Sequence, residues 1–234
     1  MEFLIEKLIA KLLDRARDRS IDIRCAALRS LNRLQDYKNP EDEVIRIYCI
    51  TMQTDESEVC RKVATSLCGL NRHTLLRILD RCQDVSPMVR VTAYKRIAGK
   101  VKLSVLKHEQ VLNLIERGLA DPSEEVRSVL TDNLIPAWLN HIKNKDGQQG
   151  GLVDFVAMID PPTSLSTAKK TIECILAKWT DLNELMNHCL SPQQNLVDEN
   201  MLPICAHDYG PAVTFSWFHL YEYIKQKGLC TRTI

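Results

Sequence analysis

Apolar residues recur at intervals of three and four positions along most of the first 145 residues. The spacing is clear at 4–13, 89–101 and 112–119, where aliphatic side chains alternate with charged ones. A period of three to four residues places the apolar side chains on one face of an α-helix. The sequence therefore predicts a series of amphipathic helices, and the low number of glycines, eight, agrees with that prediction.

Four segments share an aspartate that is followed six positions later by an arginine. The pairs are Asp18 and Arg24, Asp55 and Arg61, Asp84 and Arg90, and Asp121 and Arg127. Each aspartate stands at a break between two helical patterns, and successive aspartates are 37, 29 and 37 residues apart. We therefore expect a repeating unit of two helices joined by a short turn, which buries its apolar faces by stacking on its neighbours. Ser86 and Pro87 are typical of a helix start, as an N-cap hydroxyl before a first-turn proline.

The repeat resembles the HEAT family, since the tetratricopeptide W-L-G-Y pattern and the ankyrin T-P-L-H pattern are both absent. The resemblance implies an all-α fold, a HEAT-repeat (armadillo-type) right-handed superhelical solenoid of stacked helix pairs. It also implies that the four aspartates and four arginines form a structural ladder between successive repeats. Along the chain we predict four regular repeats at 1–145, a degenerate fifth helix pair at 146–180 and an irregular helical segment at 181–234.

Aromatic residues and cysteines fall mainly on the apolar stripes of these predicted helices. We expect core packing for Tyr94, Trp138, Phe155, Trp179 and Trp217. The nine cysteines include no C-x-x-C pair, and most occupy apolar positions. We therefore expect reduced thiols, which pack as small hydrophobic side chains.

The net charge of +1 conceals an uneven distribution. Residues 15–33 contain six basic and two acidic side chains, and residues 81–107 contain seven basic and one acidic, whereas 121–160 is acidic. Second helices commonly line the concave face of a helical-repeat array, where basic side chains can neutralise phosphates. The alternative is an ordinary solvated helix face. The candidate DNA-binding residues are Arg61, Lys62, Arg90, Lys95, Arg96, Lys100 and Lys102.

Motifs for catalysis or metal binding are absent. The sequence has no G-x-x-x-x-G-K-[ST], no G-x-S-x-G and no H-E-x-x-H, and its six histidines lie far apart. We therefore predict no catalytic residue, no metal, no cofactor and no small-molecule substrate. The start of the chain lacks the features of a signal peptide and no run of 18 apolar residues occurs, so we expect no membrane contact.

Several longer motifs resemble subunit 3 of condensin complexes. The order of segments 14–48, 55–67, 81–106 and 118–130 is similar, and the most specific matches are RLQD at 33–36, VRVTAYKRIAGKV at 89–101 and EYIKQKG at 222–228. The similarity extends over residues 10–228 and fits an inner part of that family's protein.

The resemblance implies a non-enzymatic subunit that supports mitotic chromosome condensation. Its expected partners are the kleisin subunit of condensin, the SMC ATPase subunits through that kleisin, and double-stranded DNA bound without sequence specificity. Its expected location is the nucleus and mitotic chromosomes, with a cytoplasmic pool.

Two other functions remain open at this level. A HEAT adaptor of the transport-receptor or phosphatase-scaffold type would use the same basic residues to bind an acidic peptide. A helical-repeat DNA glycosylase would need an aspartate and aromatic side chains in its groove. Against the glycosylase, the turn aspartates are assigned to the ladder, and no aromatic cluster surrounds Asp132 in the sequence.

Overall fold

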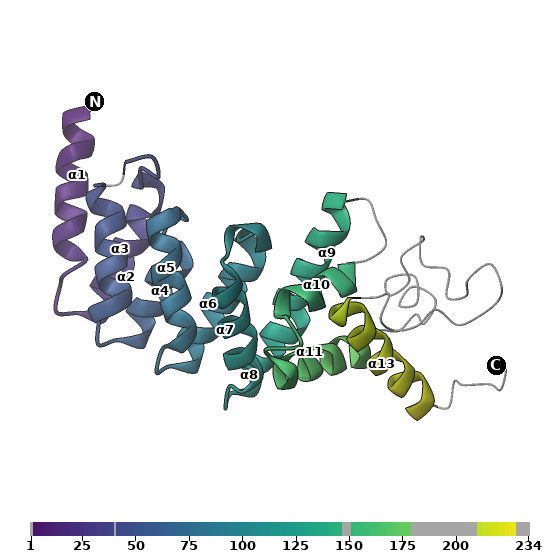
Figure 1. Cartoon of the computed structure of the whole chain (residues 1–234). Coiled ribbons are helices and arrows are strands. Elements are labelled where there is room, and N and C mark those ends of the chain that lie inside the picture. The colour runs from purple at the N-terminus through teal and green to yellow at the C-terminus, as the bar shows by residue number, and fades with distance from the viewer. Residues whose placement is uncertain (1, 40, 147–150, 179–209, 228–234) are drawn as a thin grey trace, which may run out of the picture. The chain divides into compact units, whose positions relative to one another are not determined.

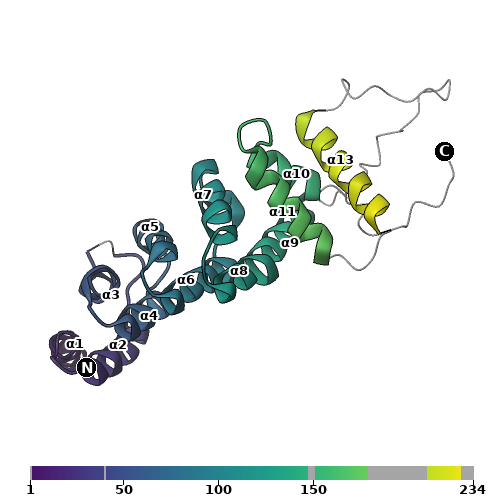
Figure 2. The same ribbon diagram turned by 90° about the horizontal axis from the view of Figure 1, so that it is seen from below.

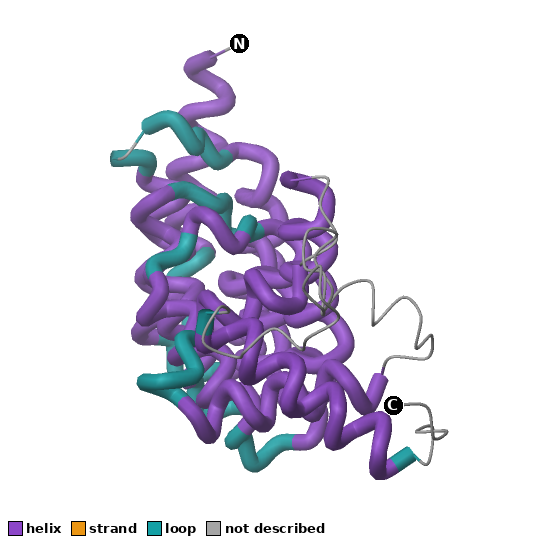
Figure 3. The backbone as a smooth tube through the Cα atoms, turned by 45° about the vertical axis from the view of Figure 1, so that its right-hand side comes forward, coloured by secondary structure: helices purple, strands orange, loops and turns teal. Residues whose placement is uncertain are grey.

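The computed structural model describes residues 2–39, 41–146, 151–178 and 210–227. These residues form helices joined by short loops, and the described part of the chain contains no strand (Figure 3). The all-helical fold expected from the sequence is therefore confirmed. The chain divides into two compact units, residues 1–101 with 123–129, and residues 102–122 with 130–234. The sequence-based division at residues 145 and 180 stays a prediction.

The first unit contains paired helices arranged in rows. α2, α4, α6 and α8 pack side by side in one row, which we call the second-helix row, while α3 and α5 pack against each other in another (Figures 1 and 2). The elements are α1 (Glu2–Arg15), α2 (Ile21–Leu31), η1 (Asn32–Leu34), α3 (Glu43–Thr54), α4 (Glu58–Leu67), α5 (Arg72–Asp80), η2 (Arg81–Gln83), α6 (Pro87–Lys100) and α8 (Glu124–Val129).

Apolar side chains from both rows form the core of this unit. Leu28, Tyr48, Ile78 and Ile97 are completely buried, one from each of α2, α3, α5 and α6. Burial of a side chain of this size contributes about 1.5–3 kcal/mol, so the stacking of helix pairs supplies stability that no single pair has. The Tyr48 hydroxyl donates a hydrogen bond to the carbonyl oxygen of Leu28, which satisfies its polar group inside the core.

The N-terminus of α6 agrees only in part with the sequence-based prediction. Ser86 is the N-cap of α6 and Pro87 its first residue, as expected, but the Ser86 hydroxyl makes no capping hydrogen bond. Instead the Asp84 carboxylate accepts a hydrogen bond from the Ser86 backbone N–H at 2.9 Å. The prediction that the Ser86 hydroxyl caps the helix is therefore wrong. The side chain that binds the backbone of this turn belongs to Asp84, two positions earlier.

The second unit has a core built around two aromatic rings. Trp138 and Phe155 are buried, and their ring centroids are 6.4 Å apart. Trp217 is half-buried, and Trp179 lies outside the described residues. Tyr94, in the first unit, is buried as expected. The elements of the second unit are η3 (Leu103–Val105), α7 (His108–Leu119), η4 (Leu130–Leu134), α9 (Ile135–Asp146), α10 (Gly151–Ile159), α11 (Leu165–Lys178) and α13 (Pro211–Gln226).

The described cysteines are all free thiols. Cys25, Cys60, Cys68 and Cys82 are buried, and Cys49 and Cys174 are half-buried. Cys25 and Cys60 occupy α2 and α4, and their sulfur atoms are 3.4 Å apart. Within the described part of the chain, these residues therefore behave as the small core side chains that the sequence predicts.

Candidate nucleic-acid interface

Two arginines of the second helices join consecutive repeats. Arg24 donates from Nε and Nη2 to the two carboxylate oxygens of Asp55, both at 2.8 Å. Arg61 donates to the two carboxylate oxygens of Asp84 in the same bidentate way, from Nε at 2.9 Å and from Nη2 at 2.8 Å. Each arginine also uses Nη1 to bind the main chain of its own turn, as Arg61 does with the carbonyl oxygens of Asp55 and Glu56. One guanidinium therefore fixes its own turn and the turn of the next repeat.

The third ladder arginine repeats part of this pattern. Arg90 repeats the main-chain half of the pattern, because its Nη1 donates to the carbonyl oxygens of Asp84 and Val85 at 2.8 and 3.2 Å. Asp121 is buried and Arg127 is half-buried.

The environment of the ladder aspartates favours their charged form. Burial raises the pKa of Asp84, but hydrogen bonds from Arg61 and from the Ser86 backbone, together with the charges of Arg61 and Arg81, outweigh it and hold the pKa below its ordinary value. The pKa of Asp55 is likewise lowered, since Arg24 and the Ser57 backbone outweigh burial. The Asp84 side chain is only 1% exposed, so its ion pairs are shielded from water.

Arg61 and Arg96, two of the candidate DNA-binding residues, use their guanidinium groups for contacts inside the protein. All the donor atoms of the Arg61 guanidinium are bonded to protein, and its side chain is 10% exposed. Arg96 donates to the carbonyl oxygens of Ser66 and Cys68, at the C-terminus of α4. Carbonyl groups at this end of a helix lack intrahelical partners, so Arg96 caps α4 from α6. Burial lowers the pKa of Arg96, as expected for a desolvated cation.

Three other basic residues share one face of the second-helix row. Lys62 follows its ladder arginine by one position, and Arg29 and Lys95 follow theirs by five. At about 100° per residue these offsets place all three roughly 100–140° from the ladder side of their helices. Arg29 and Lys95 are exposed and Lys62 is half-buried. We call Arg29, Lys62 and Lys95 the basic stripe.

The cations of the basic stripe are available to a ligand. None of the three forms an ion pair with another described residue. Arg29 was missed by the sequence analysis, although it stands at the same offset from its ladder arginine as Lys95. Lys100 is five residues beyond Lys95 and therefore faces about 140° away from it. Lys102 follows the end of α6 and belongs to the second unit.

An acidic cleft borders one end of the basic stripe. It lies between α6 and α8 and has a volume of about 460 Å³. Lys95 contributes to its lining together with Val91 and Val129, while Glu124 and Glu125 line it from the start of α8. A phosphate backbone that continued along the stripe beyond Lys95 would meet these two carboxylates, so the acidic cleft marks where the surface that favours an anionic ligand ends.

Other kinds of site receive no support from the described residues. No group of three or more histidine, cysteine or acidic side chains within that part of the chain is arranged to hold a metal ion. No described helix has the length and apolar character needed to cross a membrane.

The chain is similar to condensin proteins over most of its length. Condensin complex subunit 3 of Homo sapiens is 27% identical over 225 residues, which are 96% of this chain and 21% of the human protein. The subunit of the same name from Xenopus laevis is also 27% identical over 225 residues. That from Schizosaccharomyces pombe is 30% identical over 143 residues, 60% of this chain. No protein-family model matches the chain.

A solved structure shares the fold. A chain in the crystal structure of the S. pombe condensin Cnd3–Cnd2 subcomplex superposes with a TM-score of 0.76 at 23% identity, over 97% of this chain and 29% of that chain. The solenoid of HEAT repeats that the sequence predicts is therefore confirmed as the fold class. This chain spans about one fifth of the length of the human and frog relatives. The chain is thus similar to condensin complex subunit 3, as its repeat motifs and C-terminal motif predict, and it matches only part of that protein's length.

Proposed function

We propose that this chain is a non-enzymatic binding segment of a condensin HEAT subunit, which holds double-stranded DNA and the kleisin subunit. The observation that carries the proposal is the alignment with condensin complex subunit 3 over 96% of the chain. Through the kleisin, the segment would be linked to the SMC ATPase subunits. Its proposed role is in mitotic chromosome condensation, in the nucleus and on mitotic chromosomes.

The basic stripe supports the DNA-binding part of this proposal. Arg29, Lys62 and Lys95 lie on adjacent helices of the second-helix row, so their cations can follow a phosphate backbone. Contacts of this kind bind phosphates by releasing counterions and carry no base recognition. The proposed binding is therefore independent of DNA sequence and sensitive to salt.

Kleisin binding is supported by the kind of structure that this chain resembles. The similar solved structure is a subcomplex of two condensin subunits, Cnd3 and Cnd2. We take the second subunit as the counterpart of the proposed kleisin partner. The second candidate function is the peptide-binding adaptor. The acidic cleft favours it for a basic peptide, instead of the acidic peptide expected from the sequence, because Glu124 and Glu125 would attract positive charge rather than DNA.

Charge reversal tests the DNA-binding part. We expect Lys62→Glu/Lys95→Glu to weaken binding to a random-sequence duplex by at least about tenfold near physiological salt, since each reversal replaces an attraction with a repulsion. The matched control is Lys11→Glu/Lys38→Glu, which makes the same charge change on exposed lysines outside the second-helix row. Equal losses in the two variants would mean that only net charge matters, and the adaptor function would be favoured.

A further inference from the structure

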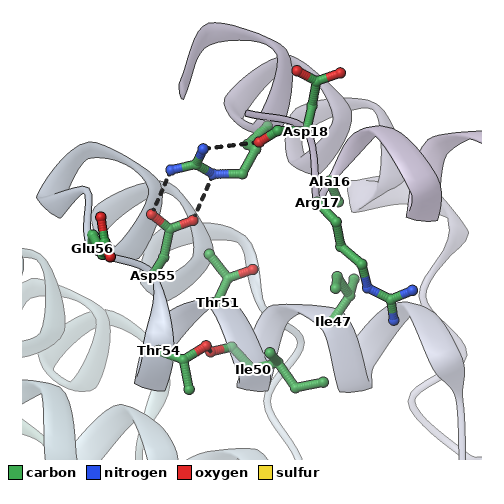
Figure 4. Close-up of a pocket in the computed structure, with 10 residues that line it drawn as sticks. Ala16, Arg17, Asp18, Ile47, Ile50, Thr51, Thr54, Asp55 and Glu56 are labelled. Atoms are coloured by element: carbon green, nitrogen blue, oxygen red, sulfur yellow. Dashed lines mark hydrogen bonds and ion pairs between the residues drawn. The ribbon is translucent and has the colours of Figure 1, made fainter. Parts of the chain in front are cut away.

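A second cleft lies in the first unit, where the turn after α1 faces α3 (Figure 4). Its volume is about 390 Å³. It contains no residue of the basic stripe. The side chains that line it are Ala16, Arg17, Asp18, Arg24, Ile47, Ile50, Thr51, Thr54, Asp55 and Glu56.

Most of the charges around this cleft are already neutralised. Arg24 and Asp55 bind each other through two hydrogen bonds of 2.8 Å, drawn as dashed lines in Figure 4. Asp18 is bound by Arg15 at 3.1 Å. Arg17 and Glu56 are different, because neither side chain forms an ion pair with any other described residue. One cation and one anion therefore remain open to a ligand.

These two open charges lie on opposite sides of the cleft, with an aliphatic surface between them. Figure 4 shows Arg17 on one side and Glu56 on the other. Ile47 is buried, while Ile50 is 39% exposed and offers apolar surface to the opening. The Thr54 hydroxyl is occupied by a hydrogen bond of 3.0 Å to the Ile50 carbonyl oxygen. From one side to the other, the cleft thus presents a positive, an apolar and a negative region.

We propose that this cleft binds an extended peptide segment of a partner protein that carries an acidic, an aliphatic and a basic side chain on one face. In an extended segment, side chains at alternate positions point to the same face, so these three would stand at positions one, three and five. The acidic side chain pairs with Arg17, the aliphatic side chain covers the exposed surface of Ile50, and the basic side chain pairs with Glu56.

The charges argue against other ligands. A nucleic-acid strand would find a single open cation in the cleft, and it would meet the carboxylates of Asp55 and Glu56 on the opposite side. A metal ion would compete with Arg24 for Asp55 and with Arg15 for Asp18, since both carboxylates are already ion-paired. A peptide with both charge signs matches both open groups, and this site does not depend on the DNA and kleisin binding proposed above.

Fluorescence anisotropy with labelled pentapeptides tests the proposal on the full chain. The probe is Asp-Ser-Leu-Ser-Lys, and the comparison peptides are Lys-Ser-Leu-Ser-Lys and Asp-Ser-Ser-Ser-Lys. We expect the probe to bind more tightly than both comparison peptides. Arg17→Glu and Glu56→Arg should each weaken probe binding about fivefold, as expected when an attraction between exposed charges is lost and replaced by a repulsion.

A double variant with the two charges exchanged tests the proposal most directly. Arg17→Glu/Glu56→Arg should restore the wild-type affinity, because the same peptide can bind in the opposite chain direction. Arg19→Glu is the matched control, an exposed arginine two positions from Arg17 whose side chain does not line the cleft. Absence of probe binding, an equal loss in Arg19→Glu, or failure of the double variant to recover would each overturn the proposal. Far-UV circular dichroism of every variant establishes that the helices are intact.

Discussion

Removing the Asp84 carboxylate tests whether the ladder holds the repeats together. This side chain accepts hydrogen bonds from Arg61 at 2.8 and 2.9 Å, from Arg81 at 2.9 Å and from the Ser86 backbone at 2.9 Å. In Asp84→Ala both guanidinium groups lose their anion, while the Arg61 side chain stays 90% shielded if the fold is unchanged. Breaking a buried ion pair from one side costs about 3–5 kcal/mol. The free energy of unfolding of a whole domain is about 5–15 kcal/mol, so this loss would be a large fraction of its stability.

Urea unfolding, followed by far-UV circular dichroism, measures this loss against two graded controls. Asp55→Ala removes one arginine contact whose partners are 15% and 7% exposed, so we expect a smaller loss. Asp18→Ala removes an ion pair in which Arg15 is 63% exposed, and we expect a loss of about 1 kcal/mol or less. The loss of stability should therefore be largest for Asp84→Ala, smaller for Asp55→Ala and smallest for Asp18→Ala. Equal losses at Asp84 and Asp18 would refute the claim that shielded bidentate pairs join the repeats.

The ladder carboxylates predict how stability depends on pH, and the contact of Arg96 with α4 predicts the effect of removing that arginine. The pKa values of Asp55 and Asp84 are lowered in the folded state, so their contribution to stability is complete above the ordinary carboxyl pKa of about 3.9 and is lost as the pH falls through the lowered values. The urea midpoint should therefore fall on acidification below about pH 4, and the fall should be smaller in Asp55→Asn/Asp84→Asn; equal pH profiles would contradict the assignment. Arg96→Ala should lower the free energy of unfolding by about 1–3 kcal/mol, because carbonyl groups at the end of α4 lose a charged donor, whereas Lys95→Ala should leave it within about 0.5 kcal/mol and weaken DNA binding instead. The opposite result at either position, measured by urea unfolding and DNA affinity, would show that the two roles are assigned wrongly.

The fold was predictable because its signals are local. Helical periodicity and the six-residue spacing from aspartate to arginine are read directly along the chain, and they place the turns where the structure has them. The partner of each arginine is not local: Arg24 binds an aspartate 31 residues away, and Arg61 binds one 23 residues away. The sequence therefore leaves Arg61 with two possible roles, and only the packing of successive repeats decides between them.

Adjacent basic residues show why the candidate site was harder to predict. Lys95 and Arg96 are neighbours of similar charge, but Lys95 is exposed and Arg96 caps the end of α4. One residue turns the side chain by about 100°, which is enough to move it from the solvent to a neighbouring helix. Arg29 could have been found by applying the Lys95 offset to the first repeat. Charge counts alone do not contain this information, because they ignore the direction of each side chain.

The most direct test of the account is the salt dependence of binding to random-sequence duplex DNA. The logarithm of the binding constant should fall linearly with the logarithm of salt concentration, with a slope of about −0.9 for each phosphate contact. In Lys62→Gln/Lys95→Gln the slope should become shallower by about two, one contact for each lysine removed. A slope unchanged by these substitutions, or no DNA binding by the wild-type chain, would contradict a DNA interface on the basic stripe.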